Sequence, residues 1–473
     1  MKKFIRYSLL LAIGALVFSG CKKFLNINTD PNHPLTVPEV VIVPPVEINI
    51  GTNVAGGFPA TTVNYWMQQL SLNQALPNVE IYFIQPADVN NTWTFTVYPN
   101  ILENLKQLIQ KAEPAGHTQY AAIGFALSAY TLAITTDLWG DVPWSQALQM
   151  PALTQPKYDP QQTIYGDVQT LLDSALYYAA QPGSLIAPST DDYIYNGDMT
   201  AWTKWIHMMK ARYYLRLSNA PGRTAATQAD SALTELALGF GSNSDNAMVP
   251  YPGGVGSPWY ENTDNAAGGV VLAQYFIDLI QGNNDPRLPI LAAPASAGAD
   301  SGLYVGRPSG APLPYNNPYQ FSIVNTAYAG VNAPLYLATY SEQLFIQAEA
   351  TFITQGAAAA DPIYRAAIKA DMDMLGVSSV AENAYLLPSS KTTLTANTAL
   401  QSIITEKYVA DFLGLEPYND WRRTGYPVIP LAQNAYVPYI PRRWPYPTNE
   451  LLANPQPQDS ATLASPVWWD TEK

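Results

Sequence analysis

The chain has 473 residues and a formal net charge of −13, with 24 Lys and Arg against 37 Asp and Glu. This length exceeds the roughly 250–300 residues that one hydrophobic core usually supports, so two subdomains or a stacked array are expected. An acidic chain with so few cations cannot neutralise a run of phosphates, which argues against nucleic acid as a partner. One Cys and three scattered His exclude a disulfide framework and a metal centre rich in thiolates or imidazoles, so no metal and no cofactor are predicted.

Residues 1–20 are predicted to be a lipoprotein signal peptide. Lys2, Lys3 and Arg6 precede an apolar stretch that is too short for an ordinary membrane span of about 20 residues but suits a secretory signal. The string Phe18-Ser19-Gly20-Cys21 resembles the bacterial lipobox, in which the thiol is acylated after the signal is removed. Cys21 is therefore the predicted lipidation site; the alternative is an ordinary signal followed by an incidental thiol.

From residue 100 to about 240 the apolar residues recur at helical spacing. Four helical segments are predicted there, each joined to the next by a connection rich in Pro, Gly and Asp. Paired helices of this length, stacked in series, favour a tetratricopeptide-like array. The apolar positions of the four segments are Ile101 to Ala112, Ile123 to Ile134, Ile164 to Ala175 and Trp202 to Tyr213.

The remaining chain divides into three parts. Residues 241–335 are rich in Pro, Gly and aromatic residues and are predicted to be loop, apart from one short helix near 270–280. Helical spacing returns over 336–413, with apolar faces beginning at Leu344, Ile363 and Leu400. Residues 414–473 contain ten Pro and cannot be mostly helix. The fold class is thus mainly α with long irregular insertions, and residues 21–473 are expected to form a single unit.

Two charged strings have both a functional and a structural interpretation. Asp137 and Asp141, four residues apart beside two Trp, would suit the acid and base of a glycosidase. Gly140 instead indicates that a helix ends here and that Asp side chains satisfy backbone donors, which we favour. Likewise, the charges of 406–407 and 420–423 would suit an anion site, but mutual pairing at a helix end is favoured.

Aromatic residues in loops rich in Asn, Gln and Pro are the candidate ligand-binding residues. A sugar ring has an apolar face and a polar rim, so an aromatic platform flanked by amides or carboxylates matches it. Core packing remains the alternative for each of these residues. The candidates are Trp66, Tyr82, Trp93, Trp259, Tyr260 and Asn262. No nucleophile elbow, phosphate-binding Gly loop or HExxH string is present, which favours a binding protein over an enzyme.

Several strings, in order along nearly the whole chain, resemble the SusD/RagB family. They are Cys21-Lys22-Lys23-Phe24-Leu25, Asp137 to Trp144, Tyr195-Asn196-Gly197-Asp198, Glu406-Lys407-Tyr408, Trp421 to Pro427, and Ile440-Pro441-Arg442-Arg443. The resemblance implies a non-catalytic outer-membrane lipoprotein, built on four tetratricopeptide-like helix pairs, with an irregular half that supplies most ligand contacts.

The resemblance also implies a function. It implies that the protein binds glycans at the cell surface and delivers them to a SusC-like TonB-dependent transporter barrel. A peptide receptor on the same scaffold and a surface glycoside hydrolase are the alternatives. The family strings are mostly framework, so the aromatic candidates rest on the chemical argument alone.

Overall fold

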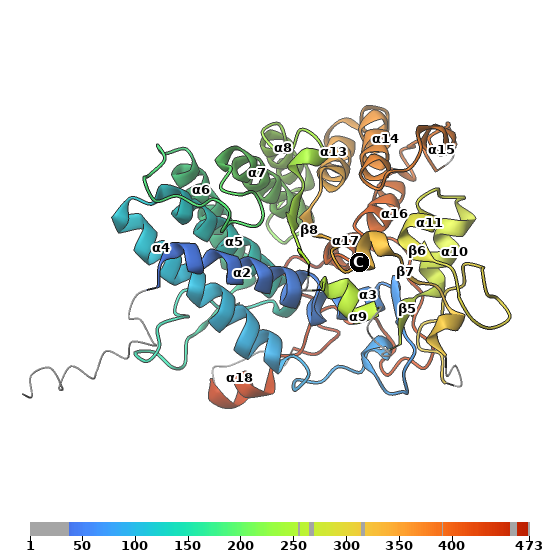
Figure 1. Ribbon diagram of the computed structural model, residues 1–473, viewed down its shortest axis with the longest axis horizontal. Helices are drawn as coiled ribbons and strands as arrows, with labels where there is room; N and C mark the ends of the chain where they lie inside the picture. Colours follow the sequence, from blue (N-terminus) through green and yellow to red (C-terminus); the bar gives the residue numbers. More distant parts are fainter. Residues whose placement is uncertain are drawn as a thin grey trace, which may run out of the picture.

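The computed structural model describes residues 37–253, 256–263, 269–313, 317–389, 391–454 and 461–471. The signal peptide and Cys21 lie outside the described residues. Within these ranges the chain is mainly helical, as predicted. Long helices follow one another in an arc from α4 through α7, α8 and α13 to α16, and short elements and loops occupy the lower right of the view (Figure 1).

The arc contains the helices expected from apolar spacing, together with α8 and α17, which were not predicted. Each helix packs against the next in the order α4, α5, α6, α7, α8, α13, and α13 packs against both α14 and α16. The helices are α4 (Glu103–Ala115), α5 (Thr118–Trp139), α6 (Gln161–Ala179), α7 (Met199–Arg216), α8 (Ala225–Leu236), α13 (Tyr340–Gln355), α14 (Ala357–Met374) and α16 (Ala399–Ala410), followed by α17 (Glu416–Thr424).

The loop-rich insertion lies between α8 and α13, yet these two helices contact each other directly. The array therefore continues across the insertion. The bonds between the Phe240 backbone and the Gln343 side chain close the junction, with N···O distances of 2.6 and 2.8 Å. Arg212 on α7 forms a buried ion pair with Glu342 on α13 at 2.6 Å.

The insertion holds more regular structure than the one helix predicted. That helix, α10 (Gln274–Gly282), begins at Gln274 because Val270–Leu272 pairs as strand β5 with β1 (Leu70–Leu72). The other short elements are α9 (Pro258–Thr263), α11 (Leu288–Leu291), η6 (Pro318–Gln320), α12 (Thr326–Ala329), and the antiparallel pairs β4 (Ala247–Val249) with β8 (Leu335–Ala338) and β6 (Ala292–Ala293) with β7 (Ile323–Val324).

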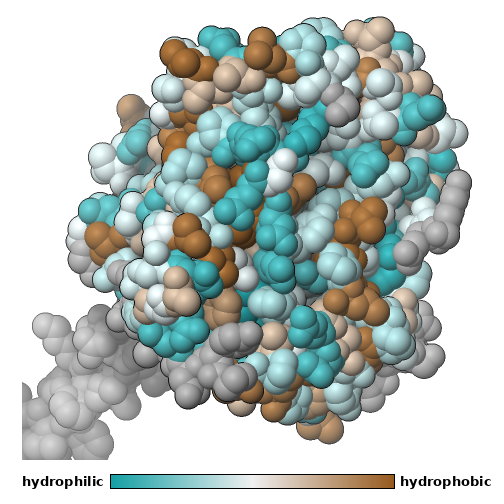
Figure 2. Space-filling model, turned by 90° about the vertical axis from the view of Figure 1, so that its right-hand side faces the viewer, coloured by the Kyte–Doolittle hydropathy of each residue, from teal (hydrophilic) through white to brown (hydrophobic). Residues whose placement is uncertain are grey.

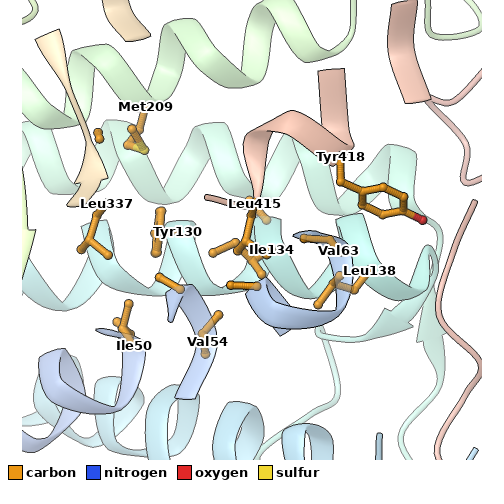
Figure 3. Packing of buried hydrophobic residues seen from close by; sticks show 14 of the residues in the cluster. Ile50, Val54, Val63, Tyr130, Ile134, Leu138, Met209, Leu337, Leu415 and Tyr418 are labelled. Atoms are coloured by element: carbon orange, nitrogen blue, oxygen red, sulfur yellow. The ribbon is translucent and has the colours of Figure 1, made fainter. Parts of the chain in front are cut away.

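The chain before α4 also forms helices, which apolar spacing did not predict. They pack onto α5, where Ile50, Val54 and Val63 lie beside Tyr130 and Ile134 (Figure 3). α5 is long and apolar enough, by length and composition, to cross a membrane, but 94% of its apolar window is buried, as expected of a core helix. The early elements are η1 (Glu39–Val41), α2 (Val43–Asn49), η2 (Ile50–Ala55), α3 (Phe58–Trp66), η3 (Val79–Ile81) and η4 (Thr92–Leu102).

After α17 the chain is mostly irregular, as its Pro content predicts, apart from α18 (Thr448–Ala453). This C-terminal part packs back onto the end of α5. The Trp139 indole donates to the Pro445 carbonyl at 2.8 Å, and the backbone N–H of Trp444 donates to the Leu138 carbonyl at 2.8 Å. Beside them lie the short pair β2 (Val142–Pro143) with β3 (Tyr158–Asp159), while α15 (Ser379–Tyr385) lies between α14 and α16 in the chain.

Candidate functional site

Four of the six predicted ligand-binding residues are buried in the core. The expectation that the rings of Trp66, Tyr82, Trp93 and Trp259 face solvent is wrong, because each is at most 5% exposed. The Trp66 indole donates to the Val79 carbonyl at 3.0 Å, and Trp93 packs edge-to-face on Trp139 with ring centroids 5.2 Å apart. Such rings bury large apolar areas, and here they anchor loops and irregular helices to the array.

Tyr260 and Asn262, on α9, are only half-buried. The Asn262 amide donates to the Gly56 carbonyl at 3.2 Å, so this side chain ties α9 to the N-terminal helices. The Tyr260 N–H donates to the Ser257 hydroxyl at 3.2 Å, within the first turn of the same helix. Because both side chains are only half-buried, they are partly accessible to a ligand, whereas their neighbour Trp259 is not.

The loop-rich half contains a surface that we call the loop face, formed by residues 73–85, 305–313 and 428–439. Backbone hydrogen bonds join its three segments: Tyr436 N–H donates to the Ile81 carbonyl, and Gln433 N–H donates to the Ser309 carbonyl, both at 2.8 Å. The Ala432 N–H donates to the Tyr82 hydroxyl at 2.9 Å. Tyr82 thus serves as a buried link between two segments rather than as an exposed ring, and burial raises the pKa of its phenol to about 12.

A cluster of buried charged and polar side chains lies beneath the loop face and holds its segments in place. The Arg307 guanidinium lies 3.1 Å from the Glu80 carboxylate, which also accepts a hydrogen bond from Ser71 at 2.5 Å. All three residues are fully buried. Burial raises the pKa of Glu80 even though Arg307 and Ser71 lower it. Arg307 also donates to the Ala311 carbonyl, so this cluster sets the path of the 305–313 segment.

Two of the three segments approach each other too closely for a side chain at Gly310. Its φ is +71°, and a Cβ placed there would lie 2.0 Å from the Gln433 carbonyl oxygen. Only Gly allows both this backbone conformation and this approach. The close contact places Gln433 and Asn434 at the surface, where the Asn434 amide donates to the Gly310 carbonyl at 3.0 Å.

On this surface the exposed ring is Tyr436. It is 63% exposed and packs edge-to-face on Phe83, with ring centroids 4.8 Å apart. The exposed side chains of Gln433 and Asn434 flank it. This is the arrangement sought from the sequence, an aromatic platform with neighbouring amides, but made by residues that the sequence reasoning missed. The signal used in the sequence analysis, an aromatic residue among Asn, Gln and Pro, is also present in Gln433-Asn434-Ala435-Tyr436. It occurs again in Asn317-Pro318-Tyr319-Gln320, where Tyr319 is 47% exposed.

The face seen in Figure 2 has its hydrophobic residues in separate small groups, with hydrophilic residues between them. A ligand held on such a surface must itself combine apolar and polar groups. The lining of a second site is more apolar. A pocket of about 440 Å³ lies beside Trp93 and is lined mainly by Pro, Leu, Met and Ala side chains. Trp93 lines that pocket but is only 5% exposed, because neighbouring rings such as Tyr98 and Tyr158 pack against it.

The structural interpretation of both charged strings is confirmed. α5 ends at Trp139, Gly140 has a φ of +79°, and Asp141 accepts the Gln161 N–H at 2.8 Å at the start of α6. Asp137 is buried and pairs with Arg216.

In the second string, Lys407 pairs with Asp411 at 2.6 Å and with Asp420 at 2.7 Å. Arg423 pairs with Asp420 at 2.9 Å and with Glu349. These charges therefore neutralise one another in the interior rather than forming an open anion site.

An arc of packed helix pairs with a loop-rich half beside it defines a mainly α fold of the tetratricopeptide-like class. A family model described as SusD-like, starch-binding associating with outer membrane, matches residues 31–447. The chain belongs to this SusD-like family. No curated protein matches it in sequence.

Solved structures confirm the fold. A chitin-binding protein is 24% identical, with 92% of this chain and 100% of that chain covered and a TM-score of 0.79. A SusD/RagB family protein from Bacteroides thetaiotaomicron is 22% identical, with coverages of 93% and 100% and a TM-score of 0.79. A SusD homologue from Bacteroides fragilis is 22% identical, with coverages of 88% and 94% and a TM-score of 0.74.

Proposed function

We propose that the protein binds an oligosaccharide on the loop face, with the ring of Tyr436, supported by Phe83, stacking on a sugar and Gln433 and Asn434 bonding to its hydroxyls. The observation that carries this proposal is the exposed ring of Tyr436, packed on the half-buried Phe83 and held beside amides on loops that hydrogen bonds join. The family description, which names starch, and the chitin-binding structural neighbour both support a glycan. Tyr260 and Asn262 remain candidates for further contacts.

The proposal extends to how the ligand is used. The protein is anchored by lipid at Cys21 on the outer membrane, exposed at the cell surface, and passes its ligand unchanged to a SusC-like TonB-dependent transporter. The family description, which associates its members with the outer membrane, supports this location. Affinity in the millimolar to micromolar range, about −4 to −8 kcal/mol, suffices and permits release into the transporter.

Calorimetry with a chitin hexasaccharide and a starch-derived maltohexaose tests the binding site. Tyr436→Ala is expected to lower the affinity for the bound sugar by about tenfold or more, the equivalent of about 1.4 kcal/mol of lost stacking. Phe83→Ala should have a smaller effect in the same direction. Tyr177→Ala is the matched control, because Tyr177 is 62% exposed but lies on α6 in the helical array.

Equal affinity of the wild type and Tyr436→Ala would remove the loop face from the proposal. Incubation with polysaccharide and an assay for new reducing ends tests the absence of catalysis, and sustained release of reducing ends would favour a glycoside hydrolase instead. Binding of an unfractionated peptide digest in place of both sugars would favour a peptide receptor.

A further inference from the structure

A polar pocket lies where α5 ends. It has a volume of about 410 Å³ and lies between the start of α6 and the C-terminal part of the chain. The residues that matter here are Gly140, Asp141, Gln162, Arg443, Tyr446 and Trp468. We call it the Arg443 pocket. It shares no residue with the loop face, so its ligand is independent of the glycan proposal.

Arg443 is 7% exposed, and within the described ranges it has no carboxylate at ion-pair distance. The other arginines that are similarly buried almost all have one: Arg212, Arg216, Arg287, Arg307, Arg423 and Arg442 each pair with an Asp or Glu. Arg422, the exception, is enclosed by backbone carbonyls and the Asn419 side chain. A buried cation without a counter-ion is unfavourable, so the site is suited to receiving an anion.

The guanidinium is held in place but not saturated. Its Nη2 donates to the Trp139 carbonyl, and the group lies over the Tyr446 ring at 4.9 Å from the centroid. Nε and Nη1 donate no hydrogen bond to another residue of the described ranges. A Cβ at Gly140 would lie 3.5 Å from both Nη atoms, so the absence of a side chain there keeps this side of the guanidinium open.

The geometry points to a carboxylate: we propose that the Arg443 pocket binds a ligand through a carboxylate group. Nη1 and the second N–H of Nη2 form one edge of the guanidinium, and such an edge matches a carboxylate with two parallel N–H···O bonds. Gln162, which is exposed at the pocket, adds an amide donor. Asp141 also lines the pocket.

Two sources carry this chemistry, an acidic sugar and the C-terminus of a peptide. The test compares galacturonic acid with its methyl ester, and N-acetyl-alanyl-alanine with its amide, by calorimetry on the purified protein. We expect at least one acid to bind tenfold or more tightly than its neutral counterpart. The pair that shows the difference identifies the source, and a difference in both pairs indicates a site for carboxylates in general.

Variants then assign the difference to Arg443. Arg443→Met should abolish the preference for the acid, Arg443→Lys should retain part of it, and Arg223→Met, which removes the same charge from an exposed turn before α8, should leave it unchanged. Glycan affinity at the loop face should persist in all three variants, so the loss of carboxylate binding can be distinguished from the loss of glycan binding. If Arg443→Met does not fold, the Lys variant and the acid-to-neutral comparison still decide. Equal binding of acids and neutral forms, or no binding of either, overturns the proposal.

Discussion

Buried charge at single residues is where this chain departs most from an ordinary core. Arg287 is fully buried with three carboxylates around it: Asp285 at 2.6 Å, Asp371 at 2.8 Å and Glu406 at 2.5 Å. One cation cannot neutralise three anions in a desolvated site, so one of the three carboxyl groups keeps its proton to a higher pH than usual. Burial, with the neighbouring Asp285 and Glu406, raises the pKa of Asp371 to about 6 although Arg287 lowers it.

This pKa gives a pH dependence of stability. The unfolded chain titrates Asp371 near 3.8, so between about pH 4 and pH 6 the folded protein binds the proton and the unfolded chain does not. The free energy of unfolding therefore falls as pH rises through this window, at most by ~1.4 kcal/mol per pH unit from this group. Asp371→Asn cannot ionise, so its stability relative to wild type should improve from pH 4 to pH 6. Urea unfolding at four pH values measures this, and parallel profiles would contradict the assignment.

The exposure of single aromatic residues could not be predicted from the sequence. Trp66, Tyr82, Trp93 and Trp259 have neighbours of the type expected for a sugar platform, but each is buried by contacts with distant parts of the chain, as when Ala432 closes over Tyr82. Tyr436 satisfies the same local criterion and is exposed. Local composition identified the right kind of residue in the loops, whereas which of them faces solvent depends on long-range packing.

At the scale of elements, the long helices other than α8 were predictable because their apolar residues recur at intervals of three and four, and the observed bounds agree within a few residues. The irregular helices η2 and η4 and the two-residue strands β2, β3, β6 and β7 were not, because such short or non-standard elements carry no periodic signal. The loop face consists of loops and the three-residue helix η3, which likewise carry no periodic signal. The proposed ligand-binding surface is therefore the part of the molecule that local sequence pattern predicts least well.

A single glycine, Gly140, determines where α5 ends. Gly140 has φ +79° and ψ −121°, a region that other residues rarely enter, and its N–H donates to the Thr136 carbonyl at 2.7 Å. Gly140→Ala is expected to lower the free energy of unfolding by ~1–3 kcal/mol. It should also narrow the Arg443 pocket.

Gly166 is the matched control for this prediction. It lies within α6, and a Cβ there meets no heavy atom within 4 Å. Gly166→Ala should therefore raise the free energy of unfolding by ~0.5–1 kcal/mol, opposite in sign to Gly140→Ala. Urea unfolding of the two variants measures both, and the same sign in both would contradict this account of the helix end.

At the scale of the whole molecule, the chain was expected to divide or to form a stacked array, and the array is what is found. One hydrophobic cluster nevertheless runs from Ile42 to Trp469 and includes residues of the N-terminal helices, the array and the C-terminal part. The Pro-rich C-terminal part was predicted to be irregular, but the sequence could not predict which helices it packs against. It returns across the end of α5, and one of its side chains contacts α5, α7 and α17 at once.

That side chain is Trp469, which is fully buried and whose indole donates to Asp137 on α5 at 2.8 Å. Arg422 of α17 and Arg216 of α7 lie over its ring, 4.6 and 5.3 Å from the centroid. Trp469→Ala leaves a cavity, removes both cation–π contacts and deprives Asp137 of a donor, so a loss of ~3–5 kcal/mol in the free energy of unfolding is expected. Leu452→Ala, at a site 79% exposed in the same C-terminal part, should stay within ~0.5 kcal/mol of wild type. Urea unfolding of both variants tests whether this ring links the last part of the chain to the array, and equal stability of the two would show that it does not.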